Sequence, residues 1–190
     1  DDMKIVVLGA AGLMGSGTVK DLLSPQSEGI DHIIAADIEQ DQLDRLSQNC
    51  PDERLETLLL SVTDKEQVVG LLKEADICIN AVPTLVGLQM DIFNSSFDAG
   101  CDYVDYGGLG KYTVMQKAEH EKWEKAGLTA VISLGADPGM SNVTCKAVAE
   151  ELDTIDKINL YWAGKLIGPE SPVLVPPYSM LTILAEYGYT

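Results

Sequence analysis

The sequence predicts an α/β protein built on a doubly wound parallel sheet of about six strands, and three observations support this class. Short β-branched segments alternate with segments of helical period along roughly the first 150 residues. A glycine-rich turn separates the first predicted strand from the first predicted helix. The 190 residues, of which 46% are hydrophobic, can bury one substantial core with part of a second domain attached.

The first three predicted strands are separated by two helical segments. The opening strand is a β-branched run that ends at Gly9, and the helix after it places Val19 and Leu22 on one face. The next helix is polar and carries Leu43 and Leu46. We therefore expect strands at residues 4–8, 32–36 and 55–60, and helices at residues 12–23 and 40–48.

Strand and helix signals continue along the next part of the chain. Thr63 and Glu66 stand three residues apart in the pattern of a capping box, which predicts a helix that carries Val68 and Leu72. One charged surface helix is expected at residues 113–126, and a last helix begins near Met140. Further strands are expected at residues 76–80, 101–105 and 128–133, which brings the count to about six.

The clearest helical periodicity lies between the fourth and fifth predicted strands. Positions 86, 90, 93 and 97 hold Val, Met, Phe and Phe, and their spacing places them on one stripe of a helix. Such a stripe could contact a bound cofactor, but packing against the sheet is the favoured interpretation.

The character of the chain changes after Asp153. Residues 157–163 predict one strand, and residues 168–177 are rich in proline and glycine and have no helical period. We therefore predict a first domain over residues 1–153. Residues 154–190 are expected to be the truncated beginning of a second, α+β domain, because so short a segment cannot close a core of its own.

Composition excludes several classes of partner. Thirteen basic residues against thirty acidic ones give a net charge of −17 with no basic cluster, so we expect binding neither to nucleic acid nor to a membrane surface. The four cysteines match neither a zinc site nor a disulfide framework, and His32 and His120 are isolated, so no metal site is expected. No apolar run is long enough to span a bilayer, and we expect a cytoplasmic protein with reduced thiols.

The glycine-rich turn is the first candidate binding site. Gly9 permits a tight turn, Gly12 lets the backbone approach a pyrophosphate, and Gly15 lets the helix pack close to the strand. The spacing is G-x-x-G-x-x-G, with free N–H groups and the positive end of the helix dipole facing the phosphates. We expect the coenzyme to contact Gly9, Ala11, Gly12, Leu13 and Met14. The alternative is a glycine turn that serves packing only.

Asp37 ends the second predicted strand, 22 residues (37 − 15) after Gly15, close to the distance expected for an acid that binds ribose. Its carboxylate would accept hydrogen bonds from the adenosine 2′-OH and repel a 2′-phosphate. NAD is therefore preferred over NADP, and Ile38 is expected to line the same site. A helix N-cap is the alternative role for Asp37.

Residues that follow the other strands are the next candidates, because ligands of such sheets bind beyond the carboxyl ends of the strands. Thr63 and Asp64 are expected near the adenine, and Tyr106 nearer the nicotinamide. Each of these segments could equally be an ordinary turn. The pyrophosphate and the nicotinamide ribose are expected near Asn80, Ala81, Val82 and Pro83.

Residues 135–142, with the sequence Gly-Ala-Asp-Pro-Gly-Met-Ser-Asn, follow the sixth predicted strand. Asp137 is well placed as an N-cap of the last helix, and Pro138 fits the first helical turn. Capping and a functional role for Asp137 are compatible.

This segment, the glycine turn, residues 80–83 and residues 103–105 resemble the saccharopine dehydrogenase family, which includes saccharopine reductases and lysine 6-dehydrogenases. The resemblance implies a Rossmann domain and an NAD(P)-dependent oxidoreductase that acts on a C–N bond of a small amino-acid substrate. It also implies that Asp137 lies at the substrate, while Tyr106 is a weaker catalytic candidate. We expect a cofactor-binding fragment of a protein that is a homodimer at full length.

Two other functions remain open from the residues alone. A short-chain dehydrogenase would need a Tyr and a Lys four residues apart on a helix, and Tyr161 and Lys165 have that spacing within an extended segment. A non-catalytic module that senses NAD is the second alternative.

Overall fold

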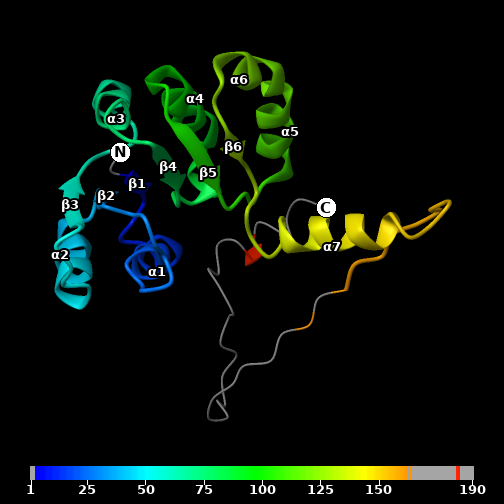
Figure 1. Ribbon diagram of the computed structural model, residues 1–190, viewed down its shortest axis with the longest axis horizontal. Helices are drawn as coiled ribbons and strands as arrows, with labels where there is room; N and C mark the ends of the chain where they lie inside the picture. Colours follow the sequence, from blue (N-terminus) through cyan, green and yellow to red (C-terminus); the bar gives the residue numbers. More distant parts are fainter. Residues whose placement is uncertain (1–2, 162, 164–182, 185–190) are drawn as a thin grey trace, which may run out of the picture. The chain divides into compact units, whose positions relative to one another are not determined.

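The computed structural model describes residues 3–161, 163 and 183–184 (Figure 1). The strands are β1 Lys4–Leu8, β2 His32–Asp37, β3 Leu55–Leu59, β4 Ile77–Asn80, β5 Asp102–Asp105 and β6 Ala130–Val131. The helices are α1 Leu13–Leu22, α2 Gln40–Asn49, α3 Lys65–Leu72, α4 Gln89–Ala99, α5 Gly110–Ala118, α6 His120–Ala126 and α7 Met140–Ala149, with a 3₁₀ turn η1 at Thr84–Val86.

The six strands form one sheet in the order β3-β2-β1-β4-β5-β6, and every neighbouring pair is parallel. Helices α1 and α2 lie on one side of the sheet, and α3, α4, α5 and α6 lie on the other (Figure 1). Right-handed crossovers require this arrangement, because the strand order runs one way from β1 to β3 and the other way from β4 to β6. The predicted doubly wound α/β fold is confirmed, and its switch point lies between β1 and β4.

Each side of the sheet buries its own core. The side chains of β1 alternate, so Val7 faces α1 and α2 whereas Val6 and Leu8 face α3 and α4. On the latter side, Phe93 of α4 stacks against Trp123 of α6 with ring centroids 4.7 Å apart. Phe93 also meets the Tyr103 ring edge-on at 5.2 Å, a geometry that aromatic pairs favour. This aromatic cluster fixes α4 and α6 to β5.

The predicted capping box is shifted by one residue. Helix α3 has Asp64 as its N-cap, and its carboxylate accepts a hydrogen bond from Gln67 N at 3.1 Å. The Gln67 amide in turn donates to the same carboxylate. Thr63 bonds to the Ser61 hydroxyl instead, at 2.8 Å. Aspartate is the better N-cap of the two, so the helix begins one residue later than the Thr63–Glu66 pattern suggests.

The predicted apolar stripe starts too early. Met90, Phe93 and Phe97 lie on the core side of α4, as expected. Val86 instead ends the turn η1, and its side chain is 57% exposed. Gly87 separates the two segments, because its φ of 88° is left-handed and interrupts the helix.

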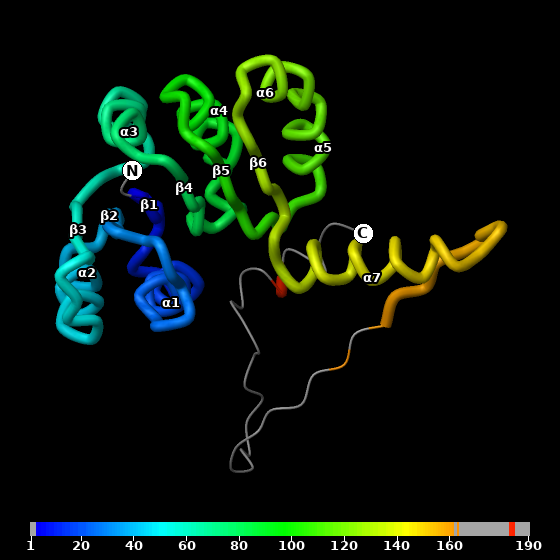
Figure 2. The backbone as a smooth tube through the Cα atoms, in the orientation of Figure 1, coloured from blue at the N-terminus to red at the C-terminus, as the bar shows by residue number. Residues whose placement is uncertain are grey.

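The helix expected at residues 113–126 is two helices, α5 and α6, which meet at Glu119 where the chain turns (Figure 2). They are more than a charged surface, because Gln116 and Trp123 are buried. Strand β6 is shorter than the predicted 128–133. Ser133 has a φ of 60° and donates its N–H to the Asp105 side chain, so the chain has left the sheet by that point.

The chain divides into two compact units, residues 1–147 and residues 148–190, and α7 crosses the boundary. The strand predicted at residues 157–163 is absent from its described positions, 157–161 and 163. Ile158 and Leu160 are exposed there, so their apolar pattern has no sheet to join. Residues 168–177 lie outside the described residues. Within the described part of the chain, no helix is long and apolar enough to cross a membrane.

Candidate functional site

The glycine turn is shaped by backbone contacts that exclude side chains. Gly9 has a φ of 76°, and a Cβ there would lie 2.9 Å from the backbone of Ala81 and Val82. A Cβ on Gly15 would lie 2.1 Å from the carbonyl oxygen of Gly9. The tight turn at Gly9 and the close packing at Gly15 are therefore confirmed as structural needs.

The first turn of α1 is open to an anion. Gly12 is its N-cap and offers no capping side chain, and the first helical turn contains no acidic residue. Leu13 and Met14 are 81% and 59% exposed, so the start of the helix is solvent-accessible. Free N–H groups and the positive end of the helix dipole at such a terminus bind phosphate groups well.

Hydrogen bonds to the Asp37 carboxylate link the glycine turn to the end of β2. One carboxylate oxygen accepts a hydrogen bond from Ala11 N at 2.9 Å, and the other accepts from Ile38 N at 2.7 Å and Glu39 N at 3.2 Å. The N-cap of α2 is Glu39, so the capping alternative for Asp37 is wrong. A carboxylate can accept about four hydrogen bonds, which leaves capacity for a ribose hydroxyl.

The turn after β4 lies against the glycine turn, as the Gly9–Ala81 approach shows. Asn80, however, is 2% exposed and points into the protein. Its amide donates to the Tyr103 hydroxyl at 2.9 Å and accepts from Val82 N at 3.1 Å. Asn80 therefore shapes the turn at residues 81–83 from within. Ala81 and Val82 are partly buried against the core, and Pro83 is exposed. Thr63 and Asp64, at the end of β3, are likewise engaged by local hydrogen bonds.

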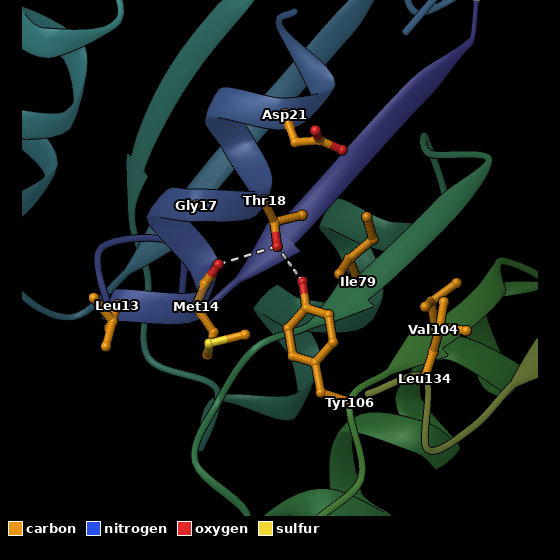
Figure 3. A pocket seen from close by; sticks show the side chains of 9 residues that line it. All are labelled: Leu13, Met14, Gly17, Thr18, Asp21, Ile79, Val104, Tyr106 and Leu134. Atoms are coloured by element: carbon orange, nitrogen blue, oxygen red, sulfur yellow. Dashed lines mark hydrogen bonds between the residues drawn. The ribbon is translucent and has the colours of Figure 1, made fainter. Parts of the chain in front are cut away.

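A cavity of about 380 Å³ lies beside the glycine turn, between α1 and the ends of β4 and β5 (Figure 3). The Tyr106 hydroxyl points across this cavity to Thr18 on α1, with which it forms a hydrogen bond. Because Thr18 donates its own proton to the carbonyl oxygen of Met14 at 3.0 Å, Tyr106 is the donor in this pair. The cavity is lined by Leu13, Met14, Gly17, Thr18, Asp21, Ile79, Val104, Tyr106 and Leu134.

A buried polar network lies beneath this edge of the sheet. The sequence predicts no site role for Asp105, Gln89 or Gln116, although Asp105 belongs to the segment 103–105 that carries part of the family resemblance. Asp105 is 1% exposed and accepts four hydrogen bonds of 2.7 to 2.8 Å, from Gly107 N, Ser133 N and two glutamine amides. Tyr103 belongs to the same network. Burial, and then the nearby Asp105 charge, raise the pKa of the Tyr103 phenol well above its usual value, so it stays protonated.

Asp137 lies on an exposed loop before α7. Its carboxylate accepts a hydrogen bond from the Ser141 hydroxyl at 2.6 Å. The predicted N-cap role is wrong, because α7 begins at Met140 and Asp137 lies three residues before it. The loop is close to Tyr106, since a Cβ on Gly107 would lie 2.8 Å from Pro138 Cγ. The two catalytic candidates therefore belong to neighbouring loops.

The fold thus gathers the glycine turn, Asp37, residues 81–83 and Tyr106 at the carboxyl edge of one sheet. A model of the saccharopine dehydrogenase NADP binding domain matches residues 5–131. The chain belongs to the saccharopine dehydrogenase family. The match includes every predicted coenzyme contact and Tyr106, and it ends before Asp137.

Two curated proteins are similar in sequence to this chain. Carboxynorspermidine synthase of Vibrio alginolyticus is 31% identical over 124 residues, which is 57% of this chain and 30% of that protein. Carboxyaminopropylagmatine dehydrogenase of Synechocystis sp. is 25% identical over 166 residues, 83% of this chain and 40% of that protein. The chain therefore spans 30% to 40% of the length of these relatives.

The fold of the family is also found in a solved structure. Saccharopine dehydrogenase (L-Glu forming) from Saccharomyces cerevisiae superposes with a TM-score of 0.64 at 18% identity, over 78% of this chain and 31% of that one. The short-chain dehydrogenase pattern has no support, because Tyr161 is 88% exposed and belongs to no helix, and Lys165 lies outside the described residues. In the described part of the chain, no group of three or more His, Cys, Asp or Glu residues could hold a metal ion.

Proposed function

We propose that this chain is the coenzyme-binding part of an oxidoreductase that transfers a hydride between NAD(P) and the carbon of a C–N bond. The observation that supports this proposal is the uncapped start of α1 behind a turn whose glycines exclude side chains. Backbone N–H groups there would hold the pyrophosphate without arginines, in a protein whose net charge is −17. The bound coenzyme supplies the hydride chemistry.

The proposed substrate is an amino acid or another carboxylated amine. The names of the two relatives refer to a carboxylated norspermidine and a carboxylated aminopropylagmatine, so a lysine or saccharopine substrate is one choice within a wider class. Asp137 would favour the cationic nitrogen of such a substrate by its charge. It is exposed and belongs to a loop adjacent to the one that follows β5, where the nicotinamide is expected.

The proposed coenzyme preference is for NAD. Asp37 at the end of β2 would accept the adenosine 2′-OH and repel a 2′-phosphate. Arg45, which could pair with that phosphate, lies further along on α2 with an exposed side chain. The matching family model is named for NADP, so the proposed preference for NAD depends on Asp37 alone.

Calorimetric titrations with NADH and NADPH test the coenzyme assignment. We expect NADH to bind about tenfold more tightly, and Asp37→Ala to narrow or reverse that difference. Asp37 also accepts a hydrogen bond from Ala11 N, which Asp37→Ala would remove. Asp37→Asn is therefore the matched variant, because it removes the charge and keeps one acceptor oxygen. Equal affinities in the unmutated protein would contradict the NAD preference. Binding of neither coenzyme would contradict the function itself.

Turnover by the full-length protein tests the reaction. NADH formation, followed by absorbance, is expected with at least one amino acid or carboxylated amine in a panel that includes lysine and saccharopine. Tight binding of NADH without turnover on any member of the panel would favour a non-catalytic sensor.

A further inference from the structure

Asp105 is a buried carboxylate at the end of β5 that no predicted binding role uses. One oxygen accepts hydrogen bonds from Gly107 N and Ser133 N, both at 2.8 Å. The other accepts from the side-chain amides of Gln89 and Gln116, both at 2.7 Å. These donors come from four places: the loop after β5, the loop after β6, α4 and α5.

Burial of a carboxylate is costly unless hydrogen bonds replace its hydration. Here four donors fill the roughly four lone-pair positions that a carboxylate offers. An apolar side chain would fill the core at this position without that cost. A carboxylate at position 105 is therefore better explained by the segments that it holds through these hydrogen bonds than by packing alone.

The two main-chain donors belong to the loops that carry the catalytic candidates. Gly107 directly follows Tyr106, and Ser133 begins the loop that leads to Asp137. The loops also touch each other, because a Cβ on Gly107 would lie 2.8 Å from Ser133 Oγ. A single oxygen of Asp105 thus ties both loops to the end of β5.

The loops have conformations that need such support. Ser133 has a φ of 60°, which is unfavourable for a residue other than glycine. Gly107 has a φ of 71°, and its carbonyl oxygen accepts a hydrogen bond from the Thr84 hydroxyl at 2.7 Å. Two left-handed residues are therefore held by one carboxylate, and a small movement of it would shift both loops.

We propose that Asp105 is a positioning residue that sets the nicotinamide end of the coenzyme site through the loops that follow β5 and β6. The inference depends on the proposed function, since it assumes a coenzyme whose nicotinamide half lies over β4 and β5. Asp105 acts through these loops and contacts neither the coenzyme nor the substrate. The glycine turn is held separately, by Asp37 and its own backbone contacts.

The test compares a ligand that has a nicotinamide with one that lacks it. Affinities of NADH and ADP-ribose are measured in the full chain, or of NADPH and 2′-phospho-ADP-ribose if that pair binds more tightly. Asp105→Asn removes the charge and one of the two acceptor oxygens with little change in shape. We expect it to weaken NADH binding about tenfold and to leave ADP-ribose binding within about twofold. The enhancement of NADH fluorescence on binding is expected to fall in parallel.

Ser96→Ala is the matched control, because it removes a buried hydroxyl of α4 that donates to the carbonyl oxygen of Cys101, before β5, and contacts neither loop. It is expected to lower stability and to leave the ratio of the two affinities unchanged. If Asp105→Asn does not fold, Gly107→Ala moves the loop directly and is expected to produce the same selective loss.

Equal losses for NADH and ADP-ribose in the variant, or no loss for either, would overturn the positioning role while the proposed function stands. Failure of the unmutated protein to bind either ligand would count against the proposed function instead.

Discussion

The two halves of the sheet differ in how they hold the glycine turn and the loops after β5 and β6. In the half formed by β1, β2 and β3, glycines bring main chain against main chain, and a side chain at Gly15 would lie 2.1 Å from a backbone oxygen. In the half formed by β4, β5 and β6, buried polar side chains reach up from the core and hold the loops from below, as Asp105 does. The glycine turn of the first half excludes side chains at Gly9 and Gly15 and has Asp37 as a side-chain contact. The starts of the loops after β5 and β6 depend on the Asp105 side chain.

This difference in the loops agrees with the role proposed for each half of the sheet. In the proposed function, N–H groups of the main chain bind a diphosphate, and this requires a bare backbone at the start of α1. The second half presents the side chains of Tyr106 and Asp137, and a loop that presents side chains outward must be fixed from its inner surface. The predictions below test this contrast, from the largest expected effect to the smallest.

Gly15→Ala should have the largest effect, because the added Cβ meets only backbone atoms that cannot move aside. We expect the free energy of unfolding to fall by about 4 kcal/mol, measured by urea denaturation. Gly17→Ala is the control in the same helix. Its Cβ would meet nothing within 4 Å, so it should stabilise by about 0.5 to 1 kcal/mol. Similar effects of the two substitutions would refute the close packing at Gly15.

Asp105→Ala should have the next largest effect, since it leaves buried donors without a partner. A loss of about 3 kcal/mol in the free energy of unfolding is expected. Asp102 on the same strand is only partly buried and accepts from Thr129 N, so Asp102→Ala should cost less than about 1 kcal/mol. A cost for Asp105→Ala as small as that for Asp102→Ala would remove the distinction between the two halves.

Thr18 and Tyr106 form a hydrogen bond that joins the halves, because Thr18 is on α1 and Tyr106 follows β5. Thr18→Val and Tyr106→Phe should each lower the free energy of unfolding by about 1 kcal/mol, and the double variant should lose little more than either. Additive losses in this double-mutant cycle would show that the two hydroxyls do not act together.

The smallest effect concerns pH and the first half alone. Arg54 holds the pKa of Asp52 at about 2, below its usual value of 3.8, mainly through a side-chain hydrogen bond. A lowered folded-state pKa contributes stability that is present above pH 3.8 and is lost as the pH falls through about 2. Asp52→Asn should therefore lose less stability than the unmutated protein between pH 4 and pH 2, by urea midpoints. An identical slope in both proteins would exclude this contribution.

The fold could be predicted from the sequence because its signals are local. β-Branched runs, helical periods and the glycine turn lie within single segments, and all six strands were expected close to where they lie. Two predicted elements were wrong as elements: the strand at residues 157–163 is absent from its described positions, and the helix at residues 113–126 is two helices. The other errors lie at boundaries. Gly87 ends a turn inside an otherwise regular apolar spacing, and Ser133 leaves the sheet because a side chain from another strand captures its N–H.

The candidate site could be predicted where its residues form a motif, or end or directly follow a strand, as the glycine turn, Asp37 and Tyr106 do. Glycines at fixed spacing form a motif, whereas Asp105 takes its side-chain partners from residues 16 and 11 positions away, on separate helices. Nothing in the sequence around Asp105, Gln89 or Gln116 marks them as neighbours. The burial of Asn80 could not be predicted from the sequence either, because its hydrogen-bond partner Tyr103 lies 23 residues further along the chain.

The contact between the rings of Phe93 and Trp123 allows unfolding of the second half of the sheet to be followed by tryptophan fluorescence. The Trp123 indole is 3% exposed, and its N–H has no hydrogen-bond partner among the described residues. A buried indole has its emission maximum at a short wavelength. The maximum shifts to longer wavelength when the indole meets water, as it would if α4 and α6 separated from β5. With Trp162 replaced by Phe, Trp123 is the single tryptophan. Its emission maximum would report whether the half formed by β4, β5 and β6 unfolds together with the half formed by β1, β2 and β3 or before it.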